Sequence, residues 1–76
     1  MNAQGRKEIA KYLASLNEIK DKLESMKDDE ETKYDNMPEG LQDSESGEQM
    51  QEAIDALDNA VNSLDEAIDS LNEIWL

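Results

Sequence analysis

Residues 53–73 contain one seven-residue pattern three times in succession. Each copy begins with alanine, has a β-branched residue in its second position and has leucine in its fifth. In heptad notation, Ile54, Val61 and Ile68 occupy the a positions and the leucines occupy the d positions. Such a repeat is typical of a helix that buries one stripe of side chains against another helix. The chain is therefore predicted to be all-α, with a helical partner for this segment.

A second amphipathic helix is predicted from about residue 3 to residue 34, where apolar residues alternate three and four positions apart. We assign these residues alternately to a and d positions: Ile9, Tyr12, Leu16, Ile19, Leu23 and Met26. An antiparallel seam sets a positions against d positions. Every a residue of one helix faces a d residue of the other if the residue numbers of each pair add up to 80, as for Leu16 with Leu64.

This register predicts an antiparallel, coiled-coil-like two-helix hairpin. Residues 1–76 would form a single domain, with a connection at about 35–44 and a second helix at about 45–75. The same register sets Gly5 opposite Trp75, so Trp75 is predicted to belong to the core rather than to a docking tail.

The predicted connection contains the only proline of the chain. Asn36 can cap a short turn there, and either Ser44 or Ser46 can begin the second helix. Met37 and Leu41 are predicted to hold the turn against the helix ends. If the connection binds a partner, its contacts are predicted to be Met37, Pro38, Leu41 and Gln42. The alternative is a proline turn that only joins two helices.

Charge is divided unevenly along the chain. Residues 1–33 contain all seven basic residues and eight acidic ones, whereas residues 34–76 contain twelve acidic residues and no basic one. This balance opposes direct binding to nucleic acid or to anionic membranes, and it favours either a basic partner or simple solubility. Lys20 and Lys27 on one edge of the first helix are predicted to face Asp58 and Asp65.

The acidic residues of the second helix fall at b, e and f positions. They are Asp55, Asp58, Asp65, Glu66, Asp69 and Glu73. A basic nucleic-acid-binding protein could bind this row in place of phosphates. The alternative is a solvated face without a partner.

An apolar stripe at the g positions of the second helix suggests self-association. It consists of Ala53, Ala60, Ala67 and Ile74. The stripe widens the buried face beyond what one partner helix covers, and a chain of 76 residues often needs a second copy to complete its core. A four-helix-bundle homodimer is therefore predicted. The alternative is a monomer whose alanines only favour helix formation.

The composition argues against catalysis. The chain has no histidine and no cysteine, which removes the usual general base, the soft metal ligands and the thiol nucleophile. We therefore expect no enzyme, no cofactor and no metal site, and the acidic connection lacks the ligand spacing of a calcium loop. No apolar run is long enough for a membrane span, and residues 1–6 do not resemble a signal peptide, so a cytoplasmic location is expected.

Residues 34–45, followed by the acidic heptads, resemble a group of small acidic proteins encoded by phages, prophages and mobile elements of Gram-positive bacteria. Its members share a first helix, a central Asp-Asn-x-Pro-Glu-x-Leu-Gln-x-Ser segment, which matches residues 35–44, and a second heptad helix. The resemblance implies an origin and a fold rather than a reaction. Relatives often have a basic or aromatic residue after the Ser-Glu step, where this chain has Ser46 and Gly47, so we expect a flexible stretch there.

Together these features suggest a non-catalytic interaction module that self-associates and binds a protein of the phage or of its bacterial host. One alternative is an inhibitor of a defence protein or a nucleic-acid-binding protein, acting through the acidic surface. Another is a purely structural or adaptor coiled coil.

Overall fold

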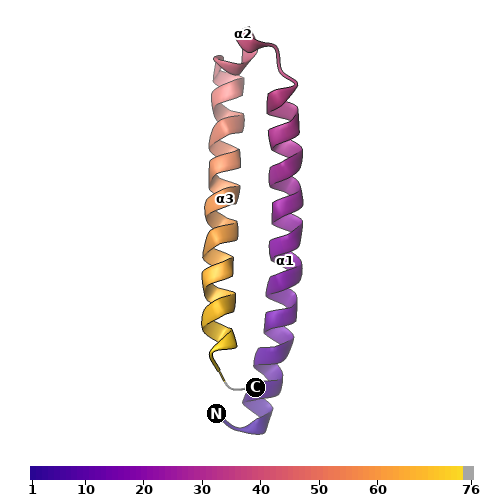
Figure 1. The fold of residues 1–76 in the computed structure, drawn as a ribbon, viewed down its shortest axis with the longest axis vertical. Coiled ribbons are helices and arrows are strands. Elements are labelled where there is room, and N and C mark those ends of the chain that lie inside the picture. Colours follow the sequence, from indigo (N-terminus) through magenta and orange to yellow (C-terminus); the bar gives the residue numbers. More distant parts are fainter. Residues whose placement is uncertain (75–76) are drawn as a thin grey trace.

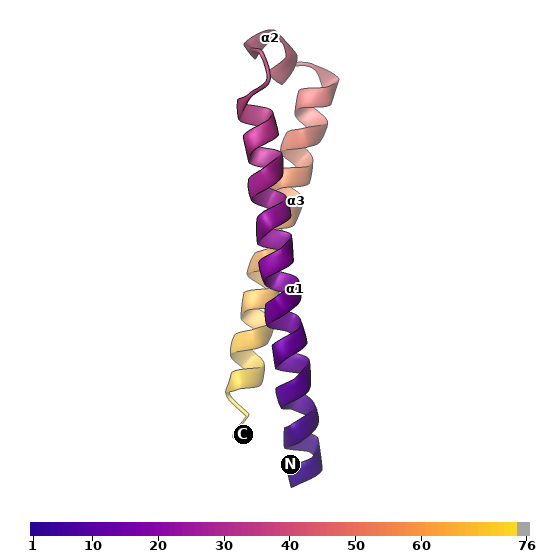
Figure 2. The ribbon, with the colours of Figure 1, turned by 90° about the vertical axis from the view of Figure 1, so that its right-hand side faces the viewer.

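The computed structural model describes residues 1–74, which form a helical hairpin. Helix α1 (Ala3–Asp35) and helix α3 (Glu45–Asn72) are joined by the short helix α2 (Glu39–Gln42). The two long helices lie side by side and antiparallel, with α2 at one end and the start of α1 and the end of α3 at the other (Figure 1). Turned by 90°, the helices cross at a small angle, and α1 extends past the end of α3 (Figure 2). The predicted all-α hairpin is confirmed.

Short polar side chains begin both long helices. Asn2 accepts a hydrogen bond from the Gly5 N–H at 2.8 Å, and Ser44 accepts one from the Gly47 N–H at 3.4 Å. These side chains satisfy N–H groups that have no partner within the helix. Ser44, and not Ser46, therefore begins the second helix.

The end of α1 differs in detail from the prediction. Asn36 closes α1, donating its backbone N–H to the Thr32 carbonyl, instead of capping the turn that follows. Pro38 precedes α2 and has no side-chain capping hydrogen bond. The helix thus ends at Asp35, one residue beyond the predicted end.

The seam between the helices differs from the predicted one on the α1 side. Leu13 is buried there, whereas Tyr12, Ile19 and Met26, predicted to be d residues, are 56%, 48% and 55% exposed. On α3 the predicted a residues are buried, as expected. The α1 side chains that are buried or half-buried along the seam are Ile9, Leu13, Leu16, Lys20, Leu23 and Lys27.

The predicted heptad assignment of α1 is therefore wrong. Lys20 and Lys27 occupy seam positions, and the apolar pattern alone favoured the neighbouring stripe. Lysine tolerates such a position because its aliphatic stem can lie along apolar surface while its ammonium reaches the edge. In the corrected assignment, Leu13 and both lysines are a residues.

The two helices are also shifted relative to the predicted register. Lys20 pairs with Asp65 and Lys27 pairs with Asp58, so the residue numbers of each ion pair add up to 85. Both aspartates are e residues, one position after a d residue, so the corresponding a–d layers add up to 84 instead of the predicted 80. The predicted pairing of Leu16 with Leu64 is therefore wrong. The predicted contact of Gly5 with Trp75 lies outside the described residues.

Gly47 belongs to the first turn of α3 and is buried. A Cβ atom at this position would lie 2.6 Å from the carbonyl carbon of Gln42 and 2.7 Å from the carbonyl oxygen of Leu41. The backbone of α2 therefore packs directly on the start of α3, at a distance that only glycine permits. The flexible stretch predicted at Ser46 and Gly47 is instead packed helix.

Candidate interaction surfaces

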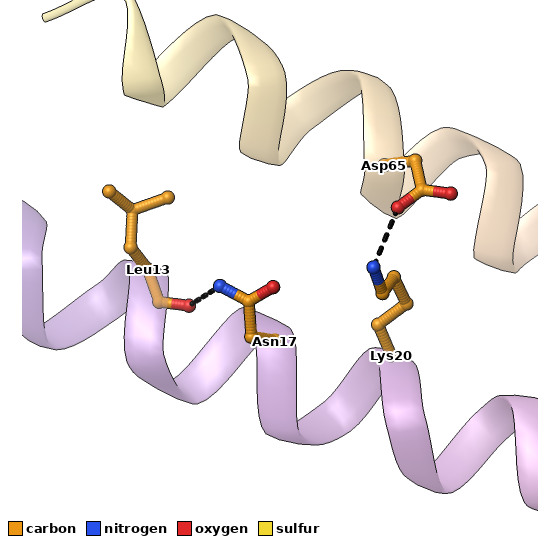
Figure 3. A network of polar contacts seen from close by, with 4 residues as sticks. All are labelled: Leu13, Asn17, Lys20 and Asp65. Carbon is orange, nitrogen blue, oxygen red and sulfur yellow. Dashed lines mark hydrogen bonds and ion pairs between the residues drawn. The ribbon is translucent and has the colours of Figure 1, made fainter.

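One edge of the hairpin, which we call the ion-pair edge, is defined by Lys20, Lys27, Asp58 and Asp65. The Nζ–Oδ1 distances are 2.9 Å for Lys20 with Asp65 and 3.1 Å for Lys27 with Asp58 (Figure 3 shows the former). The lysine side chains are only 22% exposed. The predicted approach of these lysines to these aspartates is confirmed.

These contacts change the proton affinity of both lysines. The hydrogen bond to Asp65 raises the pKa of Lys20, and the hydrogen bond to Asp58 raises the pKa of Lys27; burial opposes each shift without reversing it. Each lysine is therefore held as an ammonium ion at the seam. Nearby, the Asn17 side-chain amide donates to the Leu13 carbonyl at 2.9 Å (Figure 3).

The predicted acidic face divides into two parts. Asp58 and Asp65 belong to the ion-pair edge. The other four predicted residues are exposed, and none of them takes part in an ion pair within residues 1–74: Asp55, Glu66, Asp69 and Glu73. We call these four the outer acidic face. Because no basic residue follows Lys33, this face has no positive charge from its own helix.

The opposite edge of the hairpin is apolar. In an antiparallel coiled coil, a and e positions share one edge and d and g positions share the other. Since the ion pairs lie on the a/e edge, the g residues of both helices lie together on the far side. We call the apolar members of this set the apolar face: Tyr12, Ile19 and Met26 from α1, Ala53, Ala60 and Ala67 from α3, and Ile74, which follows the end of α3. Helix α3 ends at Asn72, three residues before its predicted end.

Exposure of the apolar face supports this placement. Its three α1 residues are about half exposed, as given above, Ala53 and Ala67 are exposed, and Ala60 and Ile74 are half-buried. The next positions outward on α3 are also small and uncharged: Ala56, Ser63 and Ser70. The predicted alanine stripe is thus extended by three large residues that the pattern had assigned to the seam.

Charge pairing did not distinguish the two stripes. Leu13, Lys20 and Lys27 also follow a seven-residue spacing, and acidic residues occupy matching e positions in the second helix. The predicted assignment accounts for the same charge pairs, so it is the burial of Leu13 that identifies the correct stripe.

The predicted contacts of the connection have different roles. The Gln42 side-chain amide donates to the Tyr34 carbonyl at 2.9 Å, and the Pro38 carbonyl accepts from the Leu41 N–H at 2.8 Å. Met37 is half-buried, but Leu41 is 52% exposed and does not hold the turn as predicted. Of the four predicted contacts, Leu41 presents the largest apolar side chain to solvent.

The start of α1 carries a shallow hollow lined by Ala3, Arg6, Lys7 and Ala10. These residues lie on a single face of one helix, and Arg6 donates to the Met1 carbonyl at 2.9 Å. Within residues 1–74, no group of three acidic side chains is arranged to hold a metal ion, and no helix is long and apolar enough to cross a membrane.

Comparisons of the chain with protein-family models, with curated proteins and with solved structures gave no match. The candidate surfaces for a partner are the outer acidic face, the apolar face and the connection.

Proposed function

We propose that this protein is a non-catalytic protein–protein interaction module that self-associates through its apolar face into a four-helix bundle and binds a further protein of a phage or its host. The observation that carries the proposal is the row of Tyr12, Ile19 and Met26, each about half exposed on a protein in which 36% of residues are charged. A contiguous exposed apolar surface on such a protein usually marks a binding site.

The thin core of the hairpin supports a second copy as the first partner. Within residues 1–74, only Leu13, Ile54, Val61 and Ile68 are buried hydrophobic residues, and no side chain there is completely enclosed. Small domains with so little core often gain stability by oligomerisation. On α1 the apolar face runs from Tyr12 to Met26, about 21 Å along the helix, and packing against a second copy would cover it.

Ala60→Glu should dissociate the dimer, because it puts a carboxylate in the middle of the apolar face, at a position other than the a and d residues of the seam. In sedimentation velocity at high micromolar concentration, the unmodified protein should sediment as a dimer and Ala60→Glu as a monomer.

Asn62→Glu is the matched control. It adds the same charge two positions along, at an exposed b position of the same helix, and should remain dimeric. An unmodified protein that sediments as a monomer would contradict the proposal.

The outer acidic face favours a second candidate function, inhibition of a basic, nucleic-acid-binding protein. Asp55 and Asp69 lie fourteen residues apart, a distance of about 21 Å along a helix. Carboxylates distributed over this length resemble the phosphate backbone in charge. The resemblance of residues 34–45 to phage and mobile-element proteins is consistent with such a role.

Salt concentration should distinguish binding of a host protein through the outer acidic face from binding through the connection. A partner captured from a bacterial lysate by the outer acidic face should be lost between low and high salt, because exposed charges are screened within about 10 Å at 0.1 M. It should also be lost with the double substitution Asp55→Asn, Asp69→Asn, and retained with Leu41→Ala. Capture that resists salt and depends on Leu41 would instead assign binding to the connection.

A further inference from the structure

We infer that the two hairpins pack about a two-fold axis parallel to their helices, so that α1 of one copy lies on α3 of the other and both connections lie at the same end. The inference rests on the proposed self-association and specifies its geometry. Two closed arrangements are available to a pair of hairpins packed face to face. In the other arrangement, which we call the crossed axis, the two-fold axis runs across the helices. The two α1 helices then pack on each other, the two α3 helices do the same, and the connections lie at opposite ends.

Side-chain size favours the parallel axis. The α1 side of the apolar face carries large residues at Tyr12, Ile19 and Met26, whereas the α3 side carries alanine at three of its four positions. Packing α1 on the α3 of the second copy sets Ile19 against Ala67 and Met26 against Ala60, which fills space evenly in these two layers. Only Tyr12, level with Ile74, meets another large residue. The crossed axis would set large against large and alanine against alanine, holding one pair of helices apart while the other pair closes.

The register within the hairpin favours the same axis. Residue numbers add up to 86 for Ile19 with Ala67 and for Met26 with Ala60, within one residue of the register set by the ion pairs, 85. These residues therefore lie level across the hairpin. Rotation about an axis parallel to the helices keeps every residue at its level. One layer would therefore contain Ile19 and Ala67 from both copies, and another would contain Met26 and Ala60 from both copies.

The distribution of charge also favours the axis parallel to the helices. Helix α3 (Glu45–Asn72) contains eight acidic residues and no basic one, whereas α1 contains all seven basic residues of the chain. The crossed axis would place the two α3 helices in direct contact, where like charges repel. The parallel axis places them at diagonal corners of the bundle, each beside two α1 helices.

Distance measurements between spin labels can test this arrangement, because the chain has no cysteine of its own. Gly40 in α2 is a suitable site: its φ is not positive, and a Cβ there meets nothing within 4 Å. With Gly40→Cys labelled, we expect a distance between copies of less than about 35 Å, since neighbouring helix axes lie 8–10 Å apart.

The crossed axis would separate the two labels by a distance close to the 58 Å length of the hairpin, and such a result would overturn the inference while leaving self-association intact. Ser25→Cys, an exposed site near the middle of α1, is the control and should give a short distance in either arrangement. The absence of any distance between copies from both sites would overturn the proposed self-association itself.

Discussion

Ile68→Ala should lower the free energy of unfolding of the hairpin by about 2–5 kcal/mol, the usual cost of removing a buried isoleucine side chain. Ile68 is 6% exposed and lies on the seam, four residues before the end of α3, so the substitution leaves a cavity that neighbouring side chains fill only in part. Urea denaturation followed by circular dichroism measures the change. The Ala60→Glu background is suitable for this measurement, because the hairpin is then expected to unfold as a monomer.

Ile19→Ala is the matched comparison, since it removes the same atoms from a residue that is 48% exposed. In the same background we expect a loss of less than about 1 kcal/mol, because the side chain already contacts water on one side. The predicted seam would have made the two residues equivalent. Equal losses of unfolding free energy from Ile19→Ala and Ile68→Ala would therefore mean that Ile19 lies in the seam, which would contradict the register described above.

Gly47→Ala should destabilise the protein by about 1–3 kcal/mol, the usual range for overpacking a closely packed site. Alanine normally stabilises a helix by up to about 1 kcal/mol relative to glycine, because glycine loses more backbone freedom on folding. Here the opposite sign is expected, since the added Cβ would meet the Gln42 and Leu41 carbonyl groups, which are backbone atoms and cannot turn aside. Thermal and urea denaturation would both report the loss.

Gly40→Ala provides the control with the same change of composition. Gly40 lies in α2, and a Cβ there has open space, so we expect a gain of about 0.4–1 kcal/mol from the reduced freedom of the unfolded chain. Two glycines seven positions apart should thus respond with opposite signs. A gain at Gly47 similar to that at Gly40 would mean that α2 does not pack on the start of α3.

Much of the fold was accessible from local patterns. Three heptads marked the seam of α3, and the polar residues at 35–46 marked the connection. Helix boundaries were predicted within one or two residues on α1 and at the start of α3, because capping by Ser44 depends on atoms a few positions away along the chain. The approach of Lys20 and Lys27 to Asp58 and Asp65 also followed from complementary charge.

The register of α1 was not accessible in the same way. Two adjacent stripes of α1 have seven-residue spacing, one entirely apolar with Tyr12, Ile19 and Met26, the other interrupted by Lys20 and Lys27. Apolar content favours the first stripe. The structure buries the second, because the lysine stems pack along the seam and their ammonium groups reach carboxylates on α3.

That choice also decides which residues a partner can reach. With Tyr12, Ile19 and Met26 in the seam, the apolar surface would be reduced to the alanine stripe of α3. With them outside it, the surface includes large residues of α1 as well as the alanines of α3. Similarly, Asp58 and Asp65 are engaged by lysines, which leaves the outer acidic face to Asp55, Glu66, Asp69 and Glu73.

By itself, the repeated heptad of residues 53–73 determined that this chain forms a helix with one buried stripe, because a seven-residue apolar period is a property of a single helix. The tertiary structure decided which stripe of α1 meets that helix, at what level, and that the backbone of α2 closes on Gly47. These outcomes depend on contacts between residues distant in the chain, where lysine stems, carboxylates and a missing Cβ act together. The heptad therefore specified that the helix needs a partner helix. Packing across the hairpin specified which surface remains exposed for a partner protein.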